Sequence, residues 1–192
     1  MPLPAGQTLQ PRRGDGMQPR AQALGKRWKR PKPRRGERFQ EKLMPKKPTA
    51  EDAQIIMRLY DLRREPEMRK ARAWFASSFW PKNADDVVQV IKAVNPQENA
   101  WFRQVSGYWD MAASFVMRGA LNEDLFFDSG AEMWFTLAKV YPFLKETREK
   151  AQTPTYLARV EKLATRTKDG RDRLQTMLKR VEARRAALAK AA

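Results

Sequence analysis

The sequence contains neither cysteine nor histidine. Without cysteine the chain forms no disulfide, thiol redox centre or thiolate zinc site, and without histidine it has no imidazole base or metal ligand. Most standard catalytic constellations, including Ser-His-Asp and Cys-His, are therefore excluded. A glycine-rich phosphate loop is also missing, which argues against nucleotide-dependent catalysis. We therefore expect a protein that is not an enzyme, has no catalytic residues and uses no cofactor.

Long apolar runs are missing as well. No stretch approaches the roughly 18 residues that a membrane span requires, and the N-terminus lacks the short apolar block of a secretory signal. The sequence therefore predicts a cytoplasmic protein with no transmembrane segment.

The positive charge is concentrated at the two ends of the chain. The net charge is +17, of which residues 1–48 contribute +11, from 14 Lys/Arg and 3 Asp/Glu. Residues 170–192 contribute +5, and residues 49–169 are nearly neutral, with 18 basic and 17 acidic side chains. If the protein binds polyanions, the two ends provide the electrostatic attraction.

The first 48 residues are predicted to be a disordered basic arm. They hold eight of the thirteen prolines and few apolar side chains, so burial cannot compensate for the entropy lost on ordering. As a nucleic-acid-binding arm, the segment would neutralise phosphates with its cations and stack a base on its tryptophan. The candidate residues are Arg27, Trp28, Lys29, Arg30, Arg34 and Arg35. Two alternatives stay open: a solvated tail, or translation that starts at Met44, where the composition changes abruptly.

Residues 49–169 carry a succession of helix signals. Thr49 with Asp52 forms a variant of the capping box, and the run Asn-Pro-Gln-Glu at residues 95–98 is the clearest helix start in the chain. The helix that begins there should extend to about Arg118, with Gly119 in the left-handed position that ends helices. Further starts are expected at Asn83, at Asn122, near Gly130 and at Thr153-Pro154, and Pro142 should break a helix.

The sequence predicts an all-α fold, because every expected element has helical spacing and no hairpin turn or alternating stretch is present. Residues 49–169 should form a single bundle of about six to seven helices. Residues 170–192 should form an amphipathic, basic C-terminal helix. Its candidate nucleic-acid contacts are Arg180, Arg184 and Arg185, and a solvated helix face is the alternative.

Adjacent aromatic pairs recur along these helices. Neighbouring residues on a helix point about 100° apart, so each pair widens the apolar face beyond one seam. Such helices are central in a bundle or face a second subunit. Base stacking is the alternative, but the pairs lie in the neutral part of the chain. The pairs are Trp74-Phe75, Trp101-Phe102, Tyr108-Trp109, Phe126-Phe127 and Trp134-Phe135.

Three carboxylates follow one another at intervals of four residues: Asp124, Asp128 and Glu132. On a continuous helix they would share one face and offer the oxygen ligands that hard cations prefer, with Asp110 as a further candidate. Carboxylates are also favoured at helix starts, and Gly130 is expected to interrupt the alignment. We therefore expect no metal site, and Asp124, Asp128 and Glu132 are its weak candidates.

The middle of the chain resembles a bacterial helical family catalogued as domain of unknown function 4760. The resemblance runs from Tyr108-Trp109 through residues 119–128 to Trp134 and the Pro-Phe-Leu run at residues 142–144, and covers roughly residues 50–150. It implies an aromatic helix, a glycine-led turn with an acidic-aromatic helix, and a Trp-bearing helix that ends in proline. The resemblance implies that many members carry an N-terminal membrane segment. This chain has a basic arm in that place. The resemblance implies no activity or site residue.

Together these features favour a non-enzymatic helical interaction module that associates with itself as a homo-oligomer. The doubled aromatic faces and the missing catalytic residues support this hypothesis. The alternative is a nucleic-acid-binding protein that acts through its basic N-terminal arm and C-terminal helix.

Overall fold

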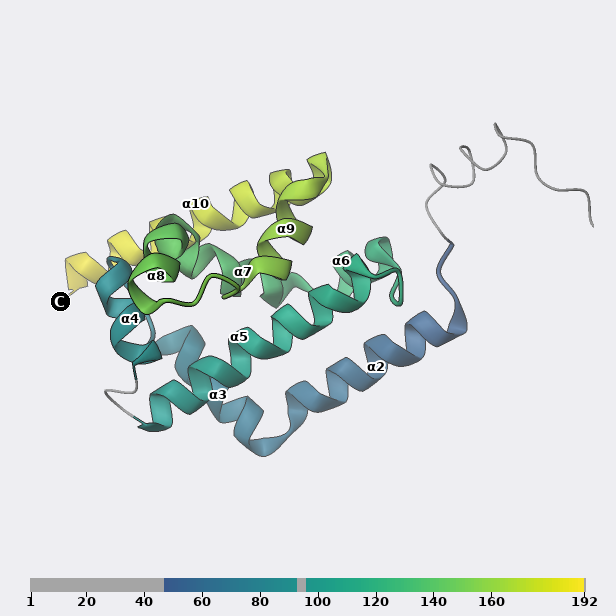
Figure 1. Ribbon diagram of the computed structural model, residues 1–192, viewed down its shortest axis with the longest axis horizontal. Helices are drawn as coiled ribbons and strands as arrows, with labels where there is room; N and C mark the ends of the chain where they lie inside the picture. The colour runs from purple at the N-terminus through teal and green to yellow at the C-terminus, as the bar shows by residue number, and fades with distance from the viewer. Residues whose placement is uncertain (1–46, 93–95, 192) are drawn as a thin grey trace, which may run out of the picture. The chain divides into compact units, whose positions relative to one another are not determined.

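The computed structural model describes residues 47–92 and 96–191, and within these residues the fold is all-α, as predicted (Figure 1). The described residues form nine α-helices and one 3-10 turn and contain no strand. Almost all of the predicted N-terminal arm, including the six candidate residues from Arg27 to Arg35, lies outside the described residues. The elements are α2 (Ala50–Arg64), α3 (Pro66–Ser77), α4 (Ala84–Ile91), α5 (Pro96–Met117), α6 (Glu123–Ser129), α7 (Ala131–Val140), η1 (Tyr141–Phe143), α8 (Leu144–Ala151), α9 (Ala158–Arg166) and α10 (Lys168–Ala191).

Capping side chains fix several of the helix starts. Thr49 Oγ1 accepts a hydrogen bond from the Asp52 N–H at 3.2 Å, and the Asp52 carboxylate accepts one from the Thr49 N–H at 2.8 Å, which confirms the predicted capping box. Asn83 caps α4 and Asn122 caps α6 through their side-chain oxygens. The local sequence therefore determines where these three helices begin.

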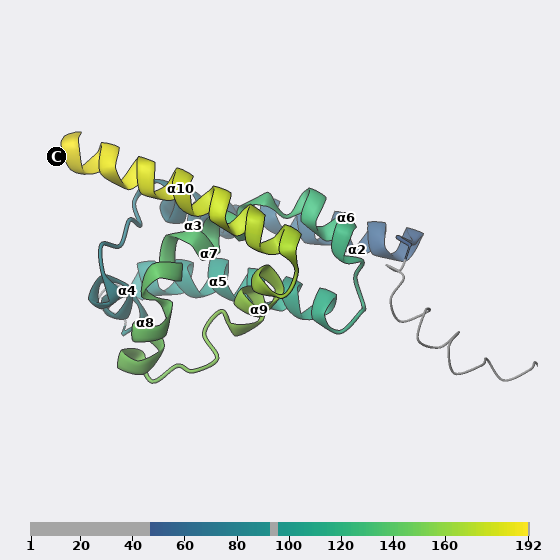
Figure 2. The same ribbon diagram turned by 90° about the horizontal axis from the view of Figure 1, so that it is seen from above.

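The long helix α5 is the centre of the bundle. It packs between α3 and α9, while α10 lies along α7 and α9 and α4 packs on α8 (Figure 2). The aromatic pairs fill this core: Trp109 and Trp134 are almost fully buried, and Trp101 is half-buried against it. Edge-on ring contacts connect successive helices, with centroids 6.3 Å apart for Trp109 and Phe126 and 5.1 Å apart for Phe127 and Trp134. Of the two positions that the sequence left open for these rings, the centre of the bundle is the one that Trp109, Phe126, Phe127 and Trp134 occupy.

Two helix starts differ from the sequence prediction. The helix expected at Thr153-Pro154 begins only at Ala158, because Leu157 has a left-handed backbone (φ 51°). The last helix begins at Lys168 and includes Gly170. A side chain at Gly170 would place its Cβ 2.7 Å from the Ala164 carbonyl oxygen, so glycine allows α10 to start close against α9.

Two predicted interruptions are present. Gly119 has a left-handed backbone (φ 73°) just after α5. Pro142 lies in the 3-10 turn η1, which separates α7 from α8.

Candidate interaction surfaces and buried polar groups

Helix α2 is poorly covered by the rest of the bundle. Of its 15 residues only Asp52 and Leu59 are buried, although the helix carries six large apolar side chains. Met57 is 61% exposed and Tyr60 is 51% exposed. Contiguous exposed apolar side chains are a common mark of interaction sites, so α2 is a candidate contact surface.

A shared carboxylate holds the C-terminal end of α2. Glu132 of α7 accepts hydrogen bonds from Arg63 Nη2 of α2 at 2.5 Å and from Arg72 Nε and Nη2 of α3 at 2.7 and 2.6 Å. The Tyr108 hydroxyl of α5 donates to the Leu59 carbonyl at 2.8 Å, and burial raises the pKa of Tyr108 to about 12. Polar contacts with α3, α5 and α7 thus fix α2 in place while its outer face stays open.

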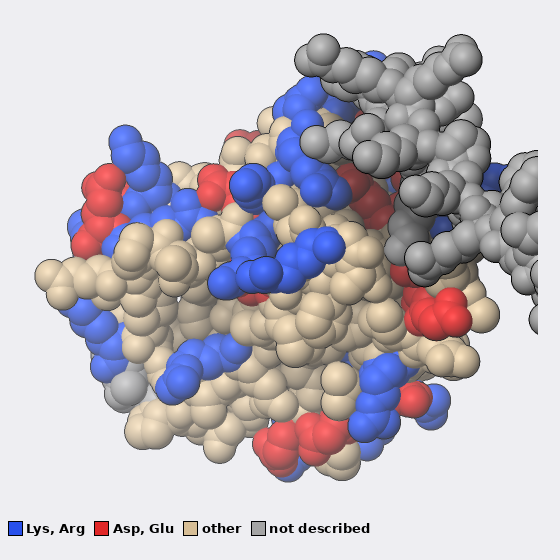
Figure 3. Space-filling view, turned by 45° about the vertical axis from the view of Figure 1, so that its right-hand side comes forward, with Lys and Arg blue, Asp and Glu red and all other residues tan. Residues whose placement is uncertain are grey.

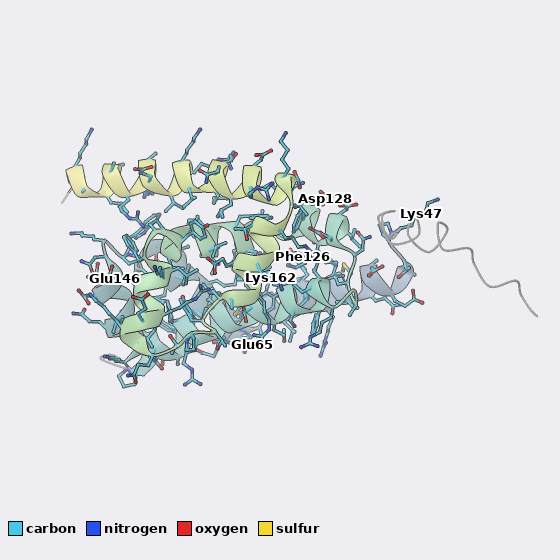
Figure 4. The ribbon with its side chains drawn as sticks, turned by 45° about the horizontal axis from the view of Figure 1, so that its top comes forward. Lys47, Glu65, Phe126, Asp128, Glu146 and Lys162 are labelled. Atoms are coloured by element: carbon cyan, nitrogen blue, oxygen red, sulfur yellow. The ribbon has the colours of Figure 1, made fainter. Side chains whose placement is uncertain are left out.

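The structure does not bring the three candidate metal ligands together. The helix breaks at Gly130, between α6 and α7, so the expected alignment of Asp124, Asp128 and Glu132 is interrupted. Asp128, on α6, is exposed and lies 3.8 Å from Arg173 (Figure 4). Asp124 is also exposed, whereas Glu132 binds two arginines. Among the described residues, no group of three or more acidic side chains is placed to hold a metal ion.

Asp110, the further candidate, caps a helix from a distance. Its carboxylate accepts hydrogen bonds from the backbone N–H groups of Arg159 (2.9 Å) and Val160 (3.2 Å) and from the Arg159 guanidinium (2.7 Å). The residue before α9, Leu157, provides no side-chain cap. Asp110 of α5 therefore supplies the acceptor that the first turn of α9 lacks.

Two of the three candidate arginines of α10 are free to contact a ligand. Arg180 and Arg184 are exposed, whereas Arg185 is half-buried. The Arg185 guanidinium donates to the Lys139 carbonyl at 3.2 Å and lies 5.4 Å from the centroid of the Phe143 ring. This side chain therefore attaches α10 to α7 and η1, and its contact with nucleic acid stays a prediction.

The outer face of α10 changes character along its length. In the first half, acidic side chains pair with basic ones, as in the contact between Arg173 and Asp169 at 2.8 Å. In the second half Lys179, Arg180, Arg184 and Lys190 are exposed, and none forms an ion pair with any residue between 47 and 191 that the structure describes. We call these four residues the α10 cationic strip. On the face that Figure 3 shows, basic side chains are scattered among acidic and uncharged ones.

A fully buried lysine is the feature that sequence reasoning missed. Lys139 of α7 has no exposed surface, and its Nζ donates to the carbonyl oxygens of Phe75 (2.5 Å) and Ala76 (3.3 Å) at the end of α3. No carboxylate in the described part of the chain pairs with it. Burial, helped by the positive charge of Arg185, lowers the pKa of Lys139 to about 7. The one available signal was its position inside the apolar run of residues 133–140.

The comparisons with known proteins identify a family. The family described as Domain of unknown function (DUF4760) matches residues 48–167. The chain belongs to this family. No curated protein and no solved structure matches the chain. Within the described residues, no helix is both long enough and apolar enough to cross a membrane. This is the family that the sequence was found to resemble. The matched region begins just ahead of α2 and ends between α9 and α10. It therefore includes the exposed helix α2 and leaves out the α10 cationic strip.

Proposed function

We propose that this protein is a non-enzymatic helical interaction module that associates with itself through α2. The exposure of Met57 and Tyr60 on a helix that is otherwise firmly attached supports the proposal. Packing these two side chains against a partner would remove apolar surface from water at about 25 cal/mol per Å². A rigid helix also loses little conformational entropy on binding.

A second copy of the chain is the partner that the α2 surface fits best. Ala53, Met57, Tyr60 and Arg64 recur at helical spacing on one side of α2, and all four are exposed. If two α2 helices pair antiparallel about a two-fold axis midway between residues 58 and 59, Met57 lies opposite the partner subunit's Tyr60, and Ala53 lies opposite the partner subunit's Arg64. The first pair gives a sulfur–aromatic contact and the second places a long side chain over a small one. The stripe is therefore complementary to itself.

Light scattering of the full chain tests this proposal. We expect a dimer at micromolar concentration and a monomer for Met57→Lys. The matched control is Met111→Lys, because Met111 is an exposed methionine of α5, 39% accessible, outside the stripe. A monomeric native chain, or a Met57→Lys protein that stays dimeric, would contradict association through α2.

Nucleic-acid binding is the second candidate function, and the α10 cationic strip favours it. Four exposed cations without acidic partners over three helical turns can neutralise phosphates, together with the basic N-terminal residues. Filter binding of DNA and RNA at several salt concentrations decides this candidate. We expect retention at low salt that falls steeply as salt is added. Absence of retention, or retention independent of salt, would rule it out.

A further inference from the structure

Two adjoining hollows lie between α5 and the segment that leads from residue 153 into α9. The first has a volume of about 400 Å³ and the second of about 330 Å³, and Thr155 lines both. Each is within the range of pockets that hold small organic ligands, roughly 300 to 1,000 Å³. Neither contains the exposed face of α2 or the α10 cationic strip, so this groove is separate from the surfaces already described.

The two hollows differ in chemistry. The first is aromatic, because the half-buried ring of Tyr156 lines it and stacks on the buried ring of Phe102 with centroids 5.6 Å apart, and the Arg103 side chain also lines it. The second is cationic: Arg118, Arg159 and Lys162 line it, and no acidic side chain does. A flat ring suits the first hollow, and an anionic group suits the second.

The cations of the second hollow are arranged to receive an anion. Asp110 fixes the Arg159 guanidinium at 2.7 Å, so this side chain is held in place before any ligand binds. Arg118 and Lys162 are exposed, and neither forms an ion pair with another residue in the described ranges. The hollow therefore combines two cations that have no counter-charge within the described part of the chain with a third that is already oriented.

We propose that this groove binds a nucleotide, with the base in the aromatic hollow and the phosphates among Arg118, Arg159 and Lys162. Guanidinium groups recognise phosphate oxygens with paired hydrogen bonds, and the lysine adds a mobile point charge. The groove has no catalytic group and no glycine-rich loop, so the nucleotide is a bound ligand and is not turned over. This site is independent of association through α2.

Calorimetric titration of the full chain with adenosine and guanosine monophosphates and triphosphates tests the site. We expect saturable binding with a Kd below about 1 mM, weakened at least tenfold in Arg118→Glu/Lys162→Glu. The control is Lys145→Glu/Lys150→Glu, which makes the same charge change on α8. Absence of binding by the native chain overturns the proposal, as does equal weakening by the two double variants.

Two further titrations test the two halves of the site. With inorganic phosphate and ribose 5-phosphate as ligands, we expect at least tenfold weaker binding than with the nucleotides, because neither carries a base. Equal affinity would show that the aromatic hollow contributes nothing and would overturn the assignment of a nucleotide. With Arg180→Glu/Arg184→Glu protein, we expect unchanged nucleotide affinity, and a loss there would place the binding on the α10 cationic strip instead.

Discussion

The Nζ atom of the fully buried Lys139 lies 3.7 Å from the centroid of the Trp80 ring. The ammonium also faces the ring of Phe135 at 4.9 Å and the last carbonyl groups of α3. Ring faces and helix C-terminal carbonyls both favour a cation, while burial without a carboxylate disfavours it. Burial without a carboxylate partner, together with the nearby positive charge of Arg185, lowers the pKa of Lys139.

Stability should therefore depend on pH through Lys139. The pKa of Lys139 is about 7 in the folded protein, whereas an ordinary, solvated lysine has a pKa of 10.5. Between pH 7 and 10.5, therefore, this lysine is protonated only in the unfolded chain. Unfolding takes up a proton there, and the free energy of unfolding rises with pH across this window, by at most about 1.4 kcal/mol per unit. Urea denaturation of the native chain and Lys139→Met from pH 6.5 to 10 measures the difference. The exposed Lys145→Met is the control, and identical pH profiles for native and Lys139→Met proteins would contradict the expectation.

Replacing the shared carboxylate should loosen α2. Glu132→Gln leaves the half-buried guanidinium groups of Arg63 and Arg72 adjacent without a counter-charge, so we expect a loss of about 1 to 3 kcal/mol in unfolding free energy. Chemical denaturation checks this value, and the exposed Glu149→Gln gives the baseline. An unchanged free energy of unfolding in Glu132→Gln would show that the cluster contributes nothing to stability.

Removing the distant cap should destabilise α9. Asp110→Ala leaves two N–H groups of the first turn without their acceptor and is expected to cost about 1 to 2 kcal/mol. Asp110→Asn keeps an acceptor oxygen and loses only the charge, so its loss should be smaller. Thermal unfolding of both variants measures the ranking, and the reverse order would argue against capping.

The arginines of α10 should separate into two classes. Arg185→Gln loses the bond to the Lys139 carbonyl and should lower stability by about 1 kcal/mol. Arg180→Gln/Arg184→Gln should leave stability unchanged and, if DNA binds, reduce the dependence of log affinity on log salt by about 2. Denaturation and filter binding on the same proteins measure both effects.

The natural lack of cysteine allows a direct test of the α2 pairing. In the proposed antiparallel dimer, position 57 lies next to its symmetry mate, so Met57→Cys should form a disulfide-linked dimer on mild oxidation. Residue 53 of one copy and residue 53 of the other lie about 16 Å apart along the helix axis, at a rise of 1.5 Å per residue. Ala53→Cys alone should therefore not cross-link. A mixture of the Ala53→Cys and Arg64→Cys proteins should cross-link, because these two positions lie opposite each other in the proposed dimer. Non-reducing electrophoresis reads the result, and efficient linkage of Ala53→Cys to itself would exclude this register.

Features encoded within a few residues were predictable from the sequence. The capping box at Thr49, the helix ending at Gly119 and the buried tryptophans follow from spacing and local chemistry. The position of α9 was not predictable, since Asp110, 49 residues before Arg159, supplies its cap. The roles of Glu132 and Lys139 depend on contacts that span 60 residues or more, and neither residue type nor periodicity signals such partners.

The cap from α5 also has a consequence for the order of folding. A nine-residue helix without a cap of its own is too short to persist in water, so α9 cannot form stably before α5 does. The polypeptide must close a loop of roughly fifty residues before the first turn of α9 gains its acceptor. Assembly of this region should accordingly be late and cooperative, with the side chain of Asp110 linking the formation of the two helices.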